Sequence, residues 1–448
     1  MVSSADDTIF ALSSGAGRAG VAVFRISGRS AAAAAKRLCG QDLTPRYATY
    51  TSFFNPIDGA LIDKGLALYF KAPASFTGED VVEVHLHGGR AVAEAFVGAC
   101  LEGLKLRPAE AGEFTERAFR AGKLDLSEAE GLADLIDAET DAQRRQALRQ
   151  MDGALSTLCE GWRSRLVAAL AYLEAAIDFP DEDDIPGEIA AKSAPEIRAL
   201  AEELQGFLDD DGRGERLREG VSVALLGAPN AGKSSLLNRL AGTEAAIVSE
   251  TPGTTRDVVE VRLDLGGVPA MVADTAGLRD APGDAVEAEG MRRAAARARD
   301  ADIRILVLDG TASAPSAPDW LRPGDFIVRN KADLKAFTSS MESVEAVETL
   351  NVSAITGAGL EAFINALGAA VADRFGVSDA PLITRARHRA AAEAACDALR
   401  RAETALAAGP ELAAEDVRLA ARALGRISGR VDVEDVLGAI FSSFCVGK

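Results

Sequence analysis

The chain of 448 residues has few cysteines and no long apolar run. Its five cysteines are scattered and contain no Cys-x-x-Cys pair, so the sequence does not describe a small disulfide-stapled module and favours a reducing cytoplasm. The N-terminus lacks the charged and then apolar pattern of a signal peptide. No uninterrupted apolar stretch reaches the roughly 18 residues that cross a bilayer, so we expect no membrane-spanning helix.

Positive charge is also scarce. The chain has 49 lysines and arginines against 68 aspartates and glutamates, which gives a formal net charge of −19. Such an acidic molecule is not expected to bind nucleic acid indiscriminately, so any RNA contact must be confined to a local basic face. The length predicts two to four domains with cores of ordinary size.

A glycine-rich loop stands between a predicted strand and a predicted helix near the middle of the chain. It reads Gly227-Ala228-Pro229-Asn230-Ala231-Gly232-Lys233-Ser234, after the apolar run 221–226 and before the helix-like run 235–240. In this context backbone N–H groups and the positive helix end point at phosphates, Lys233 adds a point charge, and the Ser234 hydroxyl reaches Mg²⁺. The pattern predicts a nucleotide phosphate site.

Three later segments extend this pattern. A polar loop at 249–257 carries threonines that can complete Mg²⁺ coordination, and in Asp274-Thr275-Ala276-Gly277 the aspartate can orient metal-bound water while the glycine N–H senses a γ-phosphate. The carboxylate of Asp333, in Asn330-Lys331-Ala332-Asp333, can accept both N–H donors of guanine, and adenine does not offer that pair. Ser353-Ala354 follows a last strand and can back the base by main-chain N–H groups.

The order of these motifs on alternating strands and helices resembles the Ras-like GTPase superfamily, whose sites lie at the carboxyl ends of the strands. The nucleotide-binding residues expected from the motifs are Asn230, Ala231, Gly232, Lys233, Ser234, Ser235, Ser249, Thr254, Thr255, Asp274, Thr275, Ala276, Gly277, Asn330, Lys331, Asp333, Ser353 and Ala354.

The N-terminal 120 residues mix short strand-like and helix-like runs, which is typical of an α+β domain. The runs 21–26 and 81–87 predict strands, and in the second of them Glu83, His85 and His87 share one face. Three ligands on a single strand rarely close a metal site, so we favour a polar surface that faces ligand or solvent over a metal centre.

Helical sequence dominates from Lys123 to Ile177, and Ser127-Glu128-Ala129-Glu130 is interpreted as a capping box. A second capping box at Ser193 is expected to open a helix that runs toward Leu217. Helical patterns return after residue 376 and predict that the C-terminal helices complete the bundle begun at Lys123, with the nucleotide domain inserted within it.

The expected fold is therefore multidomain, with an α+β N-terminal domain, an all-α helical domain and an inserted Ras-like α/β G domain. The expected boundaries are 1–122, 123–215, 216–376 and 377–448, of which the second and fourth form the helical domain. Two arginine groups on predicted helices are either an RNA-facing patch or ordinary solvated faces with ion pairs; they are Arg144, Arg145, Arg149, Arg385, Arg387 and Arg389.

Signatures along the whole chain resemble the MnmE (TrmE) family of tRNA-modifying GTPases. They are Arg25-Ile26-Ser27-Gly28, Ser75-Phe76-Thr77-Gly78-Glu79-Asp80, the run 112–119 (Gly-Glu-Phe-Thr-Glu-Arg-Ala-Phe), Lys123-Leu124-Asp125-Leu126 and the terminal Phe444-Cys445-Val446-Gly447-Lys448. The resemblance implies an N-terminal domain that dimerises and binds a one-carbon folate, such as 5,10-methylenetetrahydrofolate or its analogue 5-formyltetrahydrofolate. The implied folate contacts are Arg25, Glu83, Lys123 and Lys448.

The resemblance also implies a potassium-dependent GTPase cycle, in which K⁺ offsets charge on the transferring phosphoryl group as an arginine finger would. The implied K⁺ ligands are Asn230, Ser249, Thr251 and Thr254, and the implied Mg²⁺ ligands are Ser234 and Thr255. Ser249 stands where threonine is commoner, but it keeps the hydroxyl.

Three residues have an implied part in the chemistry. Glu287 aligns with the family's glutamate that positions the attacking water, with Glu289 as the competing choice, and Asp274 belongs to the same reaction. Cys445 lies where the family has its tail cysteine and is a weak catalytic candidate, because a thiol near a chain end is often inert.

The function implied is addition of an aminomethyl-type group to tRNA at C5 of the wobble uridine. The implied enzyme is a GTPase homodimer that works with an FAD-dependent MnmG-like partner, and the two together form a heterotetramer. The alternative is a GTP-dependent RNA-binding or ribosome-assembly factor without modification chemistry. A membrane-signalling GTPase is disfavoured because Cys445 is followed by Val-Gly-Lys rather than a lipidation signal.

Overall fold

The computed structural model describes residues 7–15, 17–179, 186–210, 212–228, 230–247, 260–274, 301–311, 318, 320–334, 347–376, 382–431 and 434–447. The chain divides into two compact units. The first, here the N-terminal unit, comprises Met1–Ala133, Met151–Val167 and Ala421–Lys448, and the second, here the central unit, comprises Asp134–Gln150 and Ala168–Ala420. Among the described residues no helix is long and apolar enough to cross a membrane.

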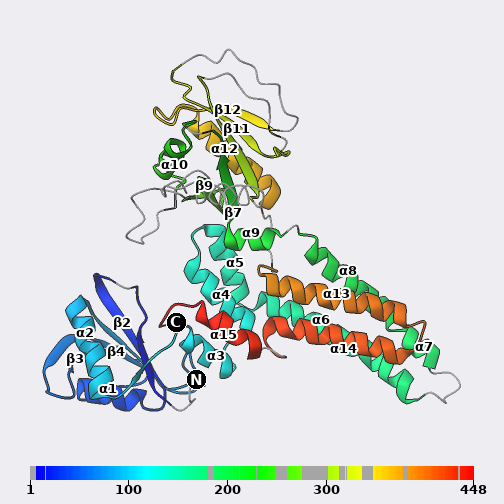
Figure 1. Ribbon diagram of the computed structural model, residues 1–448. Coiled ribbons are helices and arrows are strands. Elements are labelled where there is room, and N and C mark those ends of the chain that lie inside the picture. The colour runs from blue at the N-terminus through cyan, green and yellow to red at the C-terminus, as the bar shows by residue number, and fades with distance from the viewer. Residues whose placement is uncertain are drawn as a thin grey trace, which may run out of the picture. The chain divides into compact units, whose positions relative to one another are not determined.

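The N-terminal unit contains a sheet to which the strands labelled β2, β3 and β4 in Figure 1 belong. It has six strands in the order β3-β4-β5-β2-β1-β6. Its strands are β1 (Ile9–Leu12), β2 (Ala19–Ser27), β3 (Thr49–Phe54), β4 (Leu61–Phe70), β5 (Val81–Gly88) and β6 (Arg107–Pro108). Val82, Val84 and Leu86 are buried, while Glu83 and His85 are half-buried on the opposite face, so the predicted alternation is confirmed.

One face of this sheet is covered by α1 (Ala31–Cys39) and α2 (Arg90–Gly98), which is followed by a π-helical turn at Ala99–Gly103. The resulting core includes Phe24, whose ring centroid lies 4.5 Å from that of Phe96 on α2. The other face carries the half-buried Glu83 and His85 together with a small apolar cluster that includes Ile9, Ala11 and Phe114. The candidate ligand residues of this unit lie on that face.

Helices complete the N-terminal unit. A small core of Leu126, Ala129, Phe441 and Phe444 joins α4 (Leu126–Asp137) to α15 (Glu434–Ser442), and α3 (Glu113–Arg120) contributes Phe119 to it. The chain's last described residues run back to the sheet, where Val446 bridges Ala111.

The predicted capping box at Ser127–Glu130 is wrong by two residues. Asp125 Oδ1 accepts the backbone N–H of Glu128 over 2.9 Å, and Glu128 Oε2 accepts the N–H of Asp125 over 2.8 Å, so the box is formed by Asp125 and Glu128. The Ser127 hydroxyl donates to Asp125 instead. Both serine and aspartate are good N-cap residues, and the sequence offered both.

The central unit holds a second six-stranded sheet in the order β12-β11-β10-β7-β9-β8. Its strands are β7 (Val221–Leu226), β8 (Glu260–Leu265), β9 (Val268–Asp274), β10 (Ile303–Asp309), β11 (Phe326–Asn330) and β12 (Glu348–Asn351). Strand β8 is antiparallel to β9, and the other neighbours are parallel. Parallel strands that are buried on both faces have nearly continuous apolar sequences, as seen in this part of the chain. The strand order agrees with the expected Ras-like domain.

Helices precede and follow this sheet in the chain, and one of the earlier helices packs against one of the later ones. The earlier ones are α5 (Asp141–Met151), α6 (Ala154–Asp178), α7 (Pro186–Ala191), α8 (Ala194–Leu208) and α9 (Arg213–Glu219); the later ones are α12 (Leu360–Phe375), α13 (Ala386–Ala405) and α14 (Pro410–Ser428). Between α8 and α13, the Cys396 thiol donates to the Ala201 carbonyl and Arg198 pairs with Glu403. These contacts agree with the expectation that C-terminal helices complete the earlier bundle, and the expected domain boundaries stay a prediction.

The predicted long helix from Ser193 toward Leu217 is two helices. Gly212 adopts a left-handed conformation (φ 73°) at the N-terminus of α9, which separates it from α8. Ser193 makes no side-chain cap, because its hydroxyl donates to the Ala190 carbonyl over 2.6 Å.

Candidate functional site

The glycine-rich loop leaves β7 and enters α10 (Lys233–Ala241) at the carboxyl edge of the central sheet. Gly227 and Gly232 have positive φ values of 147° and 92°. A Cβ at Gly227 would lie 2.2 Å from the Val307 carbonyl oxygen, and one at Gly232 would lie 2.1 Å from Asn330 Nδ2. Glycine is therefore required at both positions, because the loop backbone closes directly onto β10 and β11.

Lys233 lies across this loop and is 6% exposed. Its Nζ donates to the carbonyls of Gly227 and Ala228 over 2.9 and 3.0 Å. The ammonium is thereby held beside the N–H groups of the first turn of α10, where the helix dipole also favours negative charge. This arrangement suits the phosphates of a nucleotide.

Ser234 and Asp274 meet at the next position. Ser234 Oγ donates to Asp274 Oδ2 over 2.8 Å, and Asp274 is buried at the end of β9. Hydroxyl and carboxylate oxygens are the donors that Mg²⁺ prefers, so the two side chains fit that ion. In the described part of the chain no group of three or more His, Cys, Asp or Glu could form a metal site by itself.

Asn330 links the loop to the base-binding motifs. Its Nδ2 donates to the Ala231 carbonyl over 3.1 Å, and its Oδ1 accepts the N–H of Ala354 over 3.0 Å. The side chain is 2% exposed and therefore joins the glycine-rich loop, the end of β11 and the segment after β12 from inside the domain. Three of the motifs found in the sequence thus form one connected structure.

Asp333 is held in a fixed orientation by Ser353, whose hydroxyl donates to Asp333 Oδ1 over 2.5 Å. The Ser353 hydroxyl also accepts the N–H of Thr356 over 3.1 Å. A carboxylate fixed in this way presents acceptors to the paired N–H donors of guanine.

Sequence reasoning missed the acidic neighbour of Lys331. Lys331 Nζ contacts Asp309 Oδ2 over 2.6 Å, and hydrogen bonds from Lys331 and Thr311 lower the pKa of Asp309 to about 2. The sequence could have indicated it, because Asp309 follows the mainly apolar segment 303–308, whose strand ends at the same sheet edge as Asn330.

Several predicted site residues lie outside the described residues. They are Ser249, Thr251, Thr254, Thr255, Thr275, Ala276, Gly277, Glu287, Glu289 and Lys448. Of the expected K⁺ ligands only Asn230 is described, and it is exposed with a left-handed backbone (φ 64°). Ser235 is exposed in the first turn of α10.

A second polar site lies on the open face of the N-terminal sheet. Arg25 and Glu83 are directly opposite each other on β2 and β5, and Arg25 donates to Glu83 Oε1 from Nε over 3.1 Å and from Nη2 over 2.8 Å. The Arg25 guanidinium carbon is 5.5 Å from the Phe76 ring centroid and 5.6 Å from that of Phe114. Glu83 Oε2 is 3.9 Å from His85 Nε2. Charge, aromatic surface and an imidazole are therefore gathered at one place.

Lys123 approaches the Phe76 loop from the end of α3. Its backbone N–H donates to the Ala118 carbonyl over 2.9 Å, and its Cε would lie 3.6 Å from a Cβ built on Gly78. The structure thus brings Lys123 to the same loop as Phe76.

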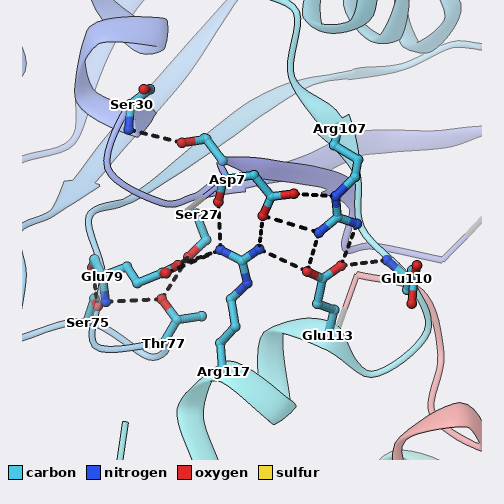
Figure 2. Close-up of polar contacts among 11 residues, drawn as sticks. Asp7, Ser27, Ser30, Ser75, Thr77, Glu79, Arg107, Glu110, Glu113 and Arg117 are labelled. Carbon is cyan, nitrogen blue, oxygen red and sulfur yellow. Dashed lines mark hydrogen bonds and ion pairs between the residues drawn. The ribbon is translucent and has the colours of Figure 1, made fainter. Parts of the chain in front are cut away.

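An ion network holds that loop (Figure 2). Arg117 Nη1 donates to the Asp7 carbonyl over 2.9 Å and to Glu79 Oε2 over 3.0 Å, and its Nη2 donates to Glu113 over 2.9 Å. Arg107 also donates to Asp7 and Glu113, by bonds of 2.6 Å and 2.5 Å at their shortest. Hydrogen bonds from Arg107 are the largest cause that lowers the pKa of Asp7, and Arg117 lowers it further. Burial would raise the pKa of Glu113, but bonds from Arg107, the Glu110 N–H and Arg117 leave it below its ordinary value.

Glu79 connects this ion network to strand β2 of the sheet. Its Oε2 accepts the Ser27 hydroxyl over 2.8 Å, and that hydroxyl is 2.7 Å from Thr77 Oγ1. Ser75 donates to the Glu79 carbonyl over 2.5 Å (Figure 2). Three separate sequence signatures, around Ser27, Glu79 and Arg117, therefore form one network.

Cys445 is exposed near the end of the chain. It lines a cavity of about 510 Å³ together with Val446, Val97 and the segments 10–15 and 108–109. The Ser13 hydroxyl donates to the Gly447 carbonyl over 2.9 Å, which fixes the tail beside β1.

The arginines considered for an RNA patch have acidic partners. Arg144 and Arg145 both pair with the exposed Asp141, while Arg385 pairs with Asp134 over 2.6 Å. Arg389 pairs with Asp210 and Glu215. Ion pairing within the helices and loops accounts for these four arginines.

Known proteins match the chain throughout its length. Residues 126–445 match the MnmE helical domain, and residues 8–123 match the family described as GTP-binding protein TrmE N-terminus. Three relatives named tRNA modification GTPase MnmE come from Parvibaculum lavamentivorans, Paramagnetospirillum magneticum and Caulobacter vibrioides, and they are 58%, 54% and 52% identical to this chain. Each alignment covers 99% of this chain and 100% of the relative. The chain therefore belongs to the MnmE (TrmE) family of tRNA modification GTPases.

Proposed function

We propose that the protein binds and hydrolyses GTP and uses the cycle to modify tRNA. One observation carries the nucleotide part: Asn330 bonds the glycine-rich loop through Ala231 and the segment after β12 through Ala354, so the phosphate and base motifs form one cradle. The membership of the MnmE family carries the tRNA part, because relatives at 52–58% identity are named for that activity.

The chain's own residues prepare the phosphate side. Lys233 and the N–H groups of α10 bind the phosphates. Ser234 and Thr255 would hold Mg²⁺, which supplies charge neutralisation on the phosphate oxygens when bound, and Asp274, bonded to Ser234, would orient metal-bound water. Asp333, oriented by Ser353, selects guanine. Glu287, or Glu289, is proposed to position the attacking water.

Potassium is proposed as a second cation, held by Asn230, Ser249, Thr251 and Thr254. Replacing K⁺ by Na⁺ should strongly depress GTP turnover by the intact protein, because the smaller ion does not replace an arginine finger in the same geometry. Equal turnover in the two salts would remove potassium from the proposal and leave GTP hydrolysis itself in place.

The N-terminal site is proposed to bind a one-carbon tetrahydrofolate. Glu83 is held by Arg25, and a carboxylate oriented in this way suits paired N–H donors such as those of a pterin ring. Phe76 and Phe114 supply aromatic surface, and Lys123, with Lys448, supplies positive charge for the acidic tail of a folate. Cys445 is kept as a candidate for the carbon-transfer chemistry.

The reaction proposed is addition of an aminomethyl-type group at C5 of the wobble uridine, by a cytoplasmic homodimer that works with an MnmG-like FAD protein. Hydrolysis would be relayed to the helices through contacts within the central unit. In support, Thr140 Oγ1 donates to the Gly267 carbonyl over 2.6 Å, at the turn that leads into β9 and so to Asp274. Gln143 Nε2 donates to the Arg218 carbonyl over 3.0 Å nearby.

Titration with a reduced folate separates this function from a GTP-dependent RNA-binding or assembly factor. Saturable binding that is lost in Glu83→Gln supports the modification enzyme. A protein that hydrolyses GTP but binds no reduced folate would favour the assembly factor.

A further inference from the structure

We propose that Asp309 is a positioning residue for Lys331 and thereby sets how long a guanine nucleotide stays bound. The inference rests on the nucleotide binding proposed above and concerns a residue outside the recognised motifs. Asp309 is the last residue of β10, and it is directly opposite Asn330, the last residue of the parallel strand β11. Lys331 is the next residue, so the topology brings Lys331 and Asp309 together at the edge where the base motifs lie.

The contact between the two side chains is close and partly shielded from solvent. Lys331 Nζ is 2.6 Å from Asp309 Oδ2, and the two side chains are 28% and 29% exposed. An ion pair at this depth is less screened by salt than one on an open surface.

Lys331 has an unfavourable backbone conformation that its neighbours maintain. Its φ is 65°, in the left-handed region that disfavours a residue with a Cβ. The Lys331 N–H donates to Asn330 Oδ1 over 2.8 Å, and the Leu334 N–H donates to the Lys331 carbonyl over 3.1 Å. In this conformation the ammonium reaches Asp309. Such strain persists only where the surroundings over-determine it, and it is concentrated at ligand sites.

Asp309 is itself held in place, because each of its two carboxylate oxygens accepts hydrogen bonds from a different residue. Oδ1 accepts hydrogen bonds from the Thr311 N–H over 2.9 Å and from the Thr311 hydroxyl over 2.6 Å, whereas Oδ2 accepts one from Lys331 Nζ. The Gly310 N–H donates to the Asn330 carbonyl over 2.8 Å, which ties the same turn to β11. The carboxylate is therefore a fixed, charged anchor for the lysine.

This anchor changes what Lys331 contributes to binding. Because Asp309 neutralises the ammonium and fixes its position, the four-carbon stem of Lys331 is ordered before a nucleotide arrives. A nucleotide then does not have to bear the entropy cost of ordering a long flexible side chain. Most affinity differences among related sites appear in the dissociation rate, so the loss of the anchor should appear there.

The test is a double-mutant cycle on the full chain, with dissociation of a fluorescent GDP as the readout. Asp309→Asn removes the charge, and Lys331→Met keeps the stem but removes the ammonium. We expect Asp309→Asn to accelerate GDP release about tenfold, Lys331→Met to accelerate it similarly, and the double variant to be no faster than Lys331→Met alone. Thr349→Val is the matched control, because Thr349 is exposed on β12 and has no part in the ion pair or in the bonds that hold Asp309; its release rate should stay within about twofold of wild type.

Three outcomes would overturn the inference: an unchanged release rate in Asp309→Asn, an undiminished effect of Asp309→Asn in the Lys331→Met background, or an effect of Thr349→Val as large as that of Asp309→Asn. Asp309→Glu, which keeps the carboxylate, should release GDP more slowly than Asp309→Asn and guards against a general folding defect. If the wild-type protein binds no guanine nucleotide, the proposed function fails and the inference fails with it. Tight wild-type binding combined with any of the three outcomes overturns the inference alone.

Discussion

The Ser234 hydroxyl donates to the Asp274 carboxylate over 2.8 Å, and this bond joins the first turn of α10 to the last residue of β9. The two residues are 40 positions apart in the sequence and come from different motifs. Their contact places a hydroxyl and a carboxylate oxygen where the phosphate loop meets the strand that leads toward the proposed catalytic glutamate.

Ser234→Ala tests this pair. Removal of the hydroxyl leaves the phosphate loop and Lys233 in place but removes one oxygen proposed for Mg²⁺. We expect Mg²⁺-dependent GTP turnover to fall roughly 100-fold, with GDP affinity in the absence of Mg²⁺ little changed. Asn238→Ala, on an exposed position of the same helix, is the control and should keep wild-type turnover. Wild-type turnover in Ser234→Ala would show that the hydroxyl has no part in the reaction.

Gly232→Ala tests the closure of the loop onto Asn330. The added Cβ would lie 2.1 Å from Asn330 Nδ2 at a φ of 92°, so either the loop or the Asn330 bonds must give way. We expect guanine nucleotide affinity to fall by at least about 100-fold, since both the backbone strain and the lost bonds act on the site. Isothermal titration with GDP measures this loss.

The matched control for that substitution is Gly206→Ala, in the last turn of α8, where a Cβ would meet nothing within 4 Å. It should leave nucleotide affinity unchanged and raise the free energy of unfolding by up to about 1 kcal/mol, because alanine is the better helix former. Equal affinities in Gly232→Ala and Gly206→Ala would contradict the described closure.

Much of the central site followed from the sequence, because the glycine-rich loop and the Asn-Lys-x-Asp segment are local patterns whose neighbours in the chain already specify strand, loop and helix. Asp309 was missed because its role depends on the pairing of β10 with β11. The Arg117 network was missed for a related reason: Asp7 and Arg117 are 110 positions apart, and no local pattern reports which charges meet across a fold.

Helix ends were predicted less well than helices. Asp125 displaced Ser127 as the cap of α4 because both residues are competent and only the geometry of the preceding turn distinguishes them. The interruption at Gly212 was hidden by the continuous helix-forming composition on its two sides.

Arg117→Met tests the ion network of the N-terminal unit. Arg117 is 10% exposed and bonds Asp7, Glu79 and Glu113, so its loss leaves these carboxylates short of donors. We expect the free energy of unfolding of this unit to fall by about 3–5 kcal/mol. Arg120→Met, in the same helix but with a 62% exposed side chain, should cost less than about 1 kcal/mol.

Fluorescence offers a local readout for that comparison. The chain has two tryptophans, and Trp162 is buried in the N-terminal unit whereas Trp320 lies in the central unit. In a Trp320→Phe background only Trp162 remains, so the change of tryptophan fluorescence in urea reports unfolding of the N-terminal unit. Equal destabilisation by Arg117→Met and Arg120→Met would contradict the described network.

The same network predicts the pH dependence of that unit. The folded-state pKa values of Asp7 and Glu113 lie below their ordinary values of 3.8 and 4.5, so both contribute stability that is fully present above those values. This contribution is lost as the pH falls through the lowered folded-state values. The free energy of unfolding of this unit, followed by Trp162 fluorescence, should be nearly constant from about pH 7 to pH 5 and should decrease once the pH is below about 4. In Arg117→Met the decline on acidification should be smaller, because only Arg107 then remains to lower the pKa values of Asp7 and Glu113 among the two arginines. An identical decline would exclude Arg117 as a cause.

Glu83→Gln tests the N-terminal ligand site separately from the nucleotide site. The substitution keeps the shape of the side chain but removes the charge that Arg25 binds, so we expect reduced-folate affinity to fall about 10- to 100-fold while GDP affinity stays the same. Glu94→Gln is the control, since Glu94 is exposed on α2 and pairs only with its helix neighbour Arg90 among the described contacts. Unchanged folate binding in Glu83→Gln would remove Glu83 from the site.

The most direct measurement is nucleoside analysis of tRNA from a strain that lacks this protein, complemented either with the wild-type chain or with Asp274→Ala. We predict that the deletion strain lacks the modification at C5 of the wobble uridine, that the wild-type chain restores it, and that Asp274→Ala does not. Normally modified wobble uridines in the deletion strain would contradict the proposed function, and full restoration by Asp274→Ala would contradict its dependence on GTP hydrolysis.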